Sequence, residues 1–165
     1  MTVKKILITT DLSTYSLAAL EAGTAIGTQF GSKLFLLYVI ESNHPLLPQH
    51  GEDVDVRAGH RKAEEQGRRR LCEFVRQHVG PDMHMSEVVR VGSPVDEILR
   101  FAELEGVDVI VMATHGWTGL RHILMGSVAE RVVRHSSIPV LTVKPESLRE
   151  SILKNEDIES DLHLR

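Results

Sequence analysis

The chain has 165 residues, enough for one domain with a substantial hydrophobic core. Its formal net charge is −4 and its isoelectric point is about 6.1, so its overall charge gives no reason to expect a nucleic-acid partner. One cysteine, Cys72, rules out an intrachain disulfide, and the first apolar run is too short for a signal peptide or a membrane span, so we expect a cytoplasmic protein without a membrane partner.

The chain opens with a predicted strand, a helix and a second strand. The β-branched run over residues 3–10 is typical of a strand that is buried on both faces. Small and apolar residues then recur with helical spacing over residues 15–30, and Gly31 is expected to end that helix. Residues 34–40 form the second apolar run, which predicts another buried strand.

A long loop, a helix and a strand are predicted next. Two prolines in residues 41–51 indicate the loop, and an apolar stripe predicts a helix over residues 54–79. Partial alternation over residues 83–91 is typical of an edge strand. Ser93 then suits the N-cap of a further helix, because Pro94 is favoured at the first helical position.

The last part of the chain contains two more apolar runs. The first, over residues 107–112, leads through a glycine-rich turn to a helix that begins at Gly126 and Ser127, and the second occupies residues 138–143. Since no two strands are close enough for a tight hairpin, the alternation predicts right-handed crossovers and an α/β domain with a parallel sheet. We assign residues 1–145 to this domain and residues 146–165 to a charged C-terminal tail, either partly helical or disordered.

Polar or small residues follow two of the predicted strands. They are Thr9, Thr10 and Asp11 after the first strand and Ala113, Thr114, His115 and Gly116 after the fourth. In open parallel sheets, ligands bind at such strand ends, where the winding reverses. Asp11 could accept hydrogen bonds from ribose hydroxyls or an adenine amine, and Gly116 would let backbone N–H groups approach a phosphate. Gly126 and Ser127 add a helix N-terminus that attracts anions, although either glycine step alone is more typical of a plain turn or helix cap.

The common nucleotide-binding loops are absent from the sequence. It contains no G-x-x-x-x-G-K-S/T, so no P-loop lysine reaches the outer phosphates. The first strand is not followed by G-x-G-x-x-G, which counts against a dinucleotide-binding domain. Any phosphate site must therefore be of another kind.

The residues after the fourth predicted strand form a longer pattern. They read A-T-H-G, then nine residues, then G-S-V-A-E-R, and the last strand reads I-P-V-L-T-V. This pattern resembles the universal stress protein family, whose nucleotide loop is spaced G-x2-G-x9-G-S/T and would here fall on Ala113, Gly116, Gly126 and Ser127. The resemblance extends to the strand that ends in Asp11, to the L-L-Y-V strand and to the glycine, serine and proline at residues 92–94.

The resemblance implies a fold, a cofactor and a partner. The fold is a three-layer sandwich around a five-stranded parallel sheet in the order 3-2-1-4-5, like that of the adenine nucleotide alpha hydrolases. The cofactor is ATP, or AMP or ADP, with Mg²⁺ entering through the phosphates. The partner is a second copy of the chain, paired through the last strand from Ile138 to Val143, and an apolar edge strand of this kind would be a hazard if left open. The implied nucleotide contacts are Thr9, Thr10, Asp11, Val39, Met112, Ala113, His115, Gly116, Gly126, Ser127 and Val128.

Two positions depart from the family pattern. Ala113 replaces the first glycine of the loop, which costs little if its φ is negative. Trp117 stands where relatives usually carry Arg or Lys, so we expect weaker affinity for the outer phosphates, with the indole packed on a subunit or a base.

The sequence favours a regulatory, dimeric protein of the stress response that binds an adenine nucleotide without efficient catalysis. It shows no paired acids, no nucleophile–base pair and no lysine at the phosphate site, so we assign no catalytic residue. One alternative is a slow ATPase or autophosphorylating protein in which Ser127 or Thr114 accepts phosphate and His115 assists. Another is a nucleotide-free interaction module that uses the long loop and the tail. We assign no metal ligand, because the spacing of His44, His50 and His60 fits no standard zinc pattern.

Overall fold

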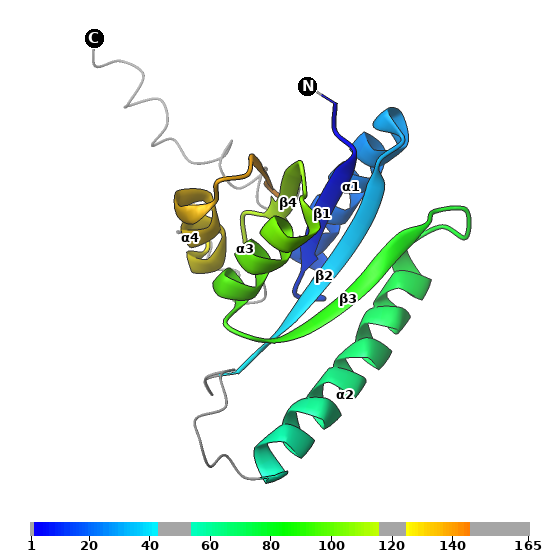
Figure 1. Cartoon of the computed structure of the whole chain (residues 1–165). Coiled ribbons are helices and arrows are strands. Elements are labelled where there is room, and N and C mark those ends of the chain that lie inside the picture. Colours follow the sequence, from blue (N-terminus) through cyan, green and yellow to red (C-terminus); the bar gives the residue numbers. More distant parts are fainter. Residues whose placement is uncertain (1, 43–53, 116–124, 146–165) are drawn as a thin grey trace, which may run out of the picture.

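The computed structural model describes residues 2–42, 54–115 and 125–145 (Figure 1). Within these residues the chain forms one five-stranded sheet with helices packed on both faces. Most of the predicted loop over residues 41–51, the turn residues Gly116 and Trp117, and the predicted tail lie outside the described residues.

All five strands are parallel and follow the order β3-β2-β1-β4-β5, which confirms the predicted sheet. The strands are β1 (Lys5–Thr10), β2 (Lys33–Glu41), β3 (Met85–Gly92), β4 (Val109–Ala113) and β5 (Val140–Val143). β2 is longer than predicted, because Glu41 pairs with Gly92 of β3 instead of starting the loop. β5 is shorter than predicted, because the backbone N–H of Ile138 donates to Ser136 Oγ in a local turn.

The α-helices follow the strands as predicted, and a short 3₁₀-helix that was not predicted precedes the first of them. They are the short 3₁₀-helix η1 (Thr14–Ser16) and the α-helices α1 (Leu17–Phe30), α2 (Val54–His78), α3 (Pro94–Glu105) and α4 (Ser127–His135). Gly31 ends α1 in the left-handed conformation, with φ 65°, as its lack of a Cβ allows. Ser93 is the N-cap residue of α3, but its side chain makes no capping hydrogen bond.

The sheet separates two hydrophobic cores. Ile8 and Leu7 are neighbours in β1, both are fully buried, and they belong to different cores. One core is completed by residues of α1 and α2 such as Leu20 and Leu71, and the other by residues of α3 and α4 such as Ile98 and Val132. The three-layer arrangement is therefore the predicted one, and β1 at its centre is held rigidly from both sides.

The N-terminal edges of β1 and β4 are joined by a side chain. The Asp108 carboxylate accepts hydrogen bonds from the backbone N–H groups of Lys4 and Lys5, at 2.7 and 2.9 Å. These two donors lower the pKa of the Asp108 carboxyl group, because they stabilise its ionised form. β1 and β4 each start two residues later than the apolar runs predict.

Two glycines form part of the buried face of α1. Phe30 is 58% exposed, whereas Gly23 and Gly27 are buried against the sheet. The reason is the closeness of the helix to the sheet, since a Cβ at Gly23 would lie 2.5 Å from Ile8 Cγ1 and one at Gly27 would lie 2.4 Å from Leu34 Cδ2. The absence of side chains at these two positions lets α1 pack directly on the sheet behind the carboxyl end of β1.

Candidate functional site

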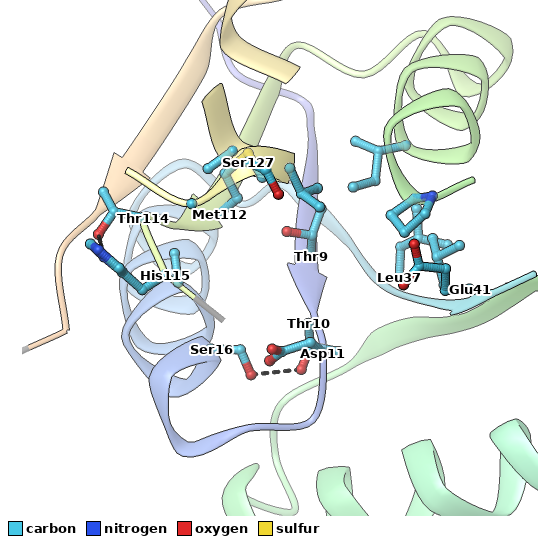
Figure 2. A pocket seen from close by; sticks show the side chains of 17 residues that line it. Thr9, Thr10, Asp11, Ser16, Leu37, Glu41, Met112, Thr114, His115 and Ser127 are labelled. Atoms are coloured by element: carbon cyan, nitrogen blue, oxygen red, sulfur yellow. Dashed lines mark hydrogen bonds between the residues drawn. The ribbon is translucent and has the colours of Figure 1, made fainter. Parts of the chain in front are cut away.

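A pocket of about 370 Å³ opens at the carboxyl ends of β1, β2 and β4 (Figure 2). In chain order, β1, β2 and β3 run from the centre of the sheet to one edge, and β4 then pairs with the other side of β1. The pocket lies at this change of direction, which is where open parallel sheets bind their ligands. Its volume falls within the range that is usual for small-molecule sites.

The predicted site residues come together in this pocket. Those that the structure describes all line it: Thr9, Thr10, Asp11, Val39, Met112, Ala113, His115, Gly126, Ser127 and Val128. Gly116 lies outside the described residues. That these residues hold a nucleotide stays a prediction.

The pocket has further lining residues that the sequence analysis did not assign to a ligand. They are Ser16, Leu37, Glu41, Pro94, Ile98, Ala129 and Thr114, the last named there as a residue of the strand end and as a phosphate acceptor but not as a nucleotide contact. The alternation of β2 could have pointed to two of them, since Leu37 and Glu41 must face the same side of the sheet as Val39. No sequence signal places α3 over the end of β2.

The two ends of the pocket differ in polarity. Leu37 and Val39 of β2 and Pro94 and Ile98 of α3 give one end an apolar surface. Figure 2 shows Leu37 at this end, and shows Thr114 and His115 at the other, with Thr9, Met112 and Ser127 between them. A ligand that fits must therefore be apolar at one end and polar at the other.

The turn after β1 holds Asp11 in place. Leu12 has φ 64°, a left-handed conformation that costs a leucine about 1 kcal/mol, and its backbone N–H donates to Thr10 Oγ1 at 2.9 Å. Asp11 Oδ1 accepts hydrogen bonds from both the backbone N–H and the hydroxyl of Ser13. Ser13 precedes η1, not α1, and its hydroxyl is bound to Asp11 and does not cap a helix. The turn therefore presents the Asp11 carboxylate in a fixed orientation.

The hydroxyls of Thr10 and Ser16, two residues that line the pocket, extend this network. Ser16 Oγ donates to the backbone oxygen of Ser13 at 2.8 Å, and it lies 2.8 Å from Thr10 Oγ1. Because Ser16 has only one hydroxyl proton, Thr10 must donate to Ser16 Oγ in this arrangement. Both hydroxyl protons are thus already used before any ligand enters.

The start of α4 faces the polar end of the pocket. The backbone N–H of Gly126 donates to the oxygen of Thr114 at 2.7 Å, which joins the end of β4 to the start of the helix. The Gly126 N–H is therefore not available to an anion, in contrast to the sequence expectation. The first bond within the helix runs from Glu130 N–H to the oxygen of Gly126, so the N–H groups of residues 127–129 lie ahead of it at the positive end of the helix dipole.

His115 sits beside the strand end and is almost completely buried. Its side chain is 6% exposed, and its Nδ1 lies 3.0 Å from Thr114 Oγ1. The hydroxyl and the imidazole are within hydrogen-bond distance, and the tautomer of His115 decides which of them is the donor. The pair is one polar feature of the pocket that can take part in chemistry.

The sequence model of the universal stress protein family matches residues 2–144. The chain belongs to this family. It is 38% identical over 142 residues to the universal stress protein MJ0531 of Methanocaldococcus jannaschii, an alignment that spans 86% of this chain and 82% of the relative. The solved structure of MJ0577 from the same organism superposes with a TM-score of 0.73 at 32% identity and covers 88% of this chain and 99% of that one.

A more distant universal stress protein has been solved in complex with cAMP. Its TM-score is 0.56 at 22% identity, and the match covers 87% of this chain and 98% of that chain. At this identity the likeness establishes a shared fold. Together with MJ0577, it places the five-stranded sheet among the structures of universal stress proteins.

The charges around the pocket of this family member come from few groups. Among the lining residues that the structure describes, Asp11 and Glu41 are acidic, and none is lysine or arginine. The described ranges contain no group of three or more His, Cys, Asp or Glu side chains arranged to hold a metal ion, and His44 and His50 fall in the undescribed segment. Nor does any helix in the described part combine the length and apolar character needed to cross a membrane.

Proposed function

We propose that this universal stress protein binds an adenine nucleotide in the pocket at the end of β1 and acts as a regulatory protein of the stress response without efficient catalysis. The observation that carries the proposal is the polarity of the pocket, with an apolar end between β2 and α3 and the start of α4 at the other. A nucleotide has the same division between its base and its phosphates. The complex of a distant family member with cAMP supports this assignment.

Each part of the nucleotide has a proposed set of contacts. Val39 and Met112 would hold the base, and the oriented carboxylate of Asp11 would accept hydrogen bonds from ribose hydroxyls. The N–H groups of Ser127 and Val128 would bind the phosphates, because the helix dipole and the unpaired first-turn donors both favour an anion there. Thr9, Thr10, Ala113, His115 and Gly116 complete the proposed site.

The proposed ligand is ATP, or AMP or ADP. Mg²⁺ would enter with the phosphates and not at a preformed site, since the described ranges contain no group of three or more His, Cys, Asp or Glu side chains arranged to hold a metal ion. The proposed unit of function is residues 1–145, and the family match over residues 2–144 supports these bounds. We propose that it acts in the cytoplasm.

We propose a homodimer through β5. This strand forms one edge of the sheet, its Leu141 is 38% exposed, and Val133 on the adjacent α4 is 46% exposed. An open apolar sheet edge has unpaired backbone groups and favours uncontrolled pairing with other chains. A dimer in which β5 pairs antiparallel with β5 of a second copy would cover this edge.

Calorimetry with ATP, AMP and cyclic AMP tests nucleotide binding. We expect a saturable heat with at least one of the three, and a raised ratio of absorbance at 260 and 280 nm if nucleotide is carried through purification. GTP serves as the matched control for non-specific phosphate binding. If none of the adenine nucleotides gave heat, the proposal would be wrong and a nucleotide-free interaction module would be the better description.

The contact between Thr114 and His115 favours autophosphorylation as a second candidate function. In this reaction Thr114 Oγ1 attacks the γ-phosphorus of ATP, the new oxygen–phosphorus bond forms as the bond to the β-phosphate oxygen breaks, and ADP leaves. The hydroxyl proton passes to His115 Nδ1, which lies 3.0 Å away.

Incubation with Mg²⁺ and ATP followed by intact mass measurement tests this second candidate. We expect the addition of one phosphoryl group in the unchanged protein and none in Thr114→Val, which keeps the shape of the side chain but lacks the hydroxyl. Ser127→Ala is the matched control, since it removes the other candidate hydroxyl. Equal labelling of the unchanged protein and Thr114→Val, with loss in Ser127→Ala, would assign the acceptor to Ser127 instead.

A further inference from the structure

Glu41 occupies a fixed position at the apolar end of the pocket. It is the last residue of β2, and the sequence analysis placed it in the following loop. Its pairing with Gly92 of β3, continued by the hydrogen bond from Ser42 N–H to the oxygen of Gly92 at 3.2 Å, fixes its backbone within the sheet. Its side chain is exposed to solvent at the pocket rim and lines the pocket.

The side chain of Glu41 points to the same face of the sheet as Val39, one of the residues proposed to hold the base. Residues along a strand alternate between faces, so Leu37, Val39 and Glu41 all project toward the α3 side. Figure 2 shows Glu41 near Leu37, away from Thr114 and His115. The sheet order explains this separation, since β2 and β4 lie on opposite sides of β1.

A carboxylate at this end of the pocket has a specific chemical consequence. It accepts hydrogen bonds but cannot donate them, and it repels phosphate. Within the described residues, Glu41 forms no hydrogen bond and no ion pair that would occupy its oxygens. A flat base held between β2 and α3 would therefore bind most tightly if a hydrogen-bond donor on its edge faced Glu41.

We propose that Glu41 determines the base specificity of this pocket by accepting a hydrogen bond from the exocyclic amine of adenine. This inference rests on the proposed function and adds to it the residue that distinguishes an aminopurine from a purine without the amine. In the proposed site, Asp11 would contact the ribose hydroxyls, and the start of α4 would contact the phosphates.

Comparison of three ligands on two variants tests the assignment. Calorimetry is carried out with ATP, with purine riboside triphosphate, which has hydrogen in place of the amine, and with dATP, which lacks one ribose hydroxyl. The unchanged protein should bind ATP about tenfold more tightly than purine riboside triphosphate, the usual effect of a charge-assisted hydrogen bond. In Glu41→Ala this ratio should fall about fivefold to tenfold, while the ratio of ATP to dATP should stay the same.

Glu87→Ala is the matched control. Glu87 is an exposed residue of β3 outside the pocket lining, so its removal changes the net charge equally and should leave both ratios unchanged. A uniform gain in affinity for all three ligands in Glu41→Ala would mean that Glu41 acts only by repelling phosphate, and a change confined to the dATP ratio would mean that it reads the sugar. Either result overturns the inference.

The proposed function and this inference can fail separately. If the unchanged protein bound ATP and purine riboside triphosphate equally well, nucleotide binding would stand and the role of Glu41 would be refuted. If it bound none of the three ligands, both would be refuted.

Discussion

Gly126→Val is expected to reduce the affinity for ATP by at least about 100-fold and to leave the fold intact. A Cβ at this position would lie 3.2 Å from the oxygen of Thr114 and 3.8 Å from His115 Cα, so the branched side chain must crowd the strand end or project into the pocket. Either outcome displaces the start of α4 from the proposed phosphate position. The loss of two charge-assisted hydrogen bonds, at about 1.5–3 kcal/mol each, accounts for the expected change.

Two further variants separate a local effect from unfolding. Gly126→Ala adds only the Cβ and should give a smaller loss in the same direction. Gly80→Val is the control, because nothing lies within 4 Å of a Cβ at Gly80 and this residue is remote from the pocket lining. Calorimetry measures the affinities and thermal unfolding measures the folds. ATP binding by Gly126→Val at full affinity, with an unchanged melting temperature, would place the phosphates elsewhere.

The fold could be predicted because its main signals are local. Buried strands such as β1 and β2 are continuous apolar runs, and residues such as Gly31 mark helix ends wherever they occur. The order of the strands came from the family resemblance. Strand ends were less accurate, because contacts with distant residues affect them. Asp108 binds the N–H of Lys4, the residue before β1, and Glu41 pairs with Gly92 at the end of β2.

The pocket was predictable to the extent that its residues follow strand ends. Thr9 to Asp11 and Ala113 to His115 were identified in this way. Pro94 and Ile98 were missed because they line the pocket only as a result of how α3 packs on the sheet, which the sequence of α3 does not reveal. The hydrogen bond from the Gly126 N–H to the oxygen of Thr114 was not foreseen, because this partner cannot be inferred from the spacing of the two residues.

The packing of α1 on β1 leads to the second large expected effect. Gly23→Ala should destabilise the protein by about 2–3 kcal/mol, although alanine is normally favoured over glycine within a helix by about 0.5–1 kcal/mol. The new Cβ would lie 2.5 Å from Ile8 Cγ1 and 2.6 Å from Ile8 Cδ1. Ile8 is fully buried in the central strand, so it cannot turn aside without disturbing the core. Urea unfolding followed by circular dichroism measures the change.

Gly59→Ala is the matched control for this prediction. Gly59 is exposed in α2 and has nothing within 4 Å of its Cβ position, so the same substitution should stabilise the protein by about 0.5–1 kcal/mol. A double mutant that combines Gly23→Ala with Ile8→Ala lacks both Ile8 atoms that the new Cβ would contact. Its loss of free energy of unfolding should be smaller than the sum of the losses of the two single mutants. Stabilisation by both glycine substitutions would contradict the close contact between α1 and β1.

The same contact bears on the pocket. Ile8 directly precedes Thr9 in β1, so the contact also holds the strand end that carries the Asp11 turn. Gly23→Ala should therefore weaken nucleotide binding as well as reduce stability.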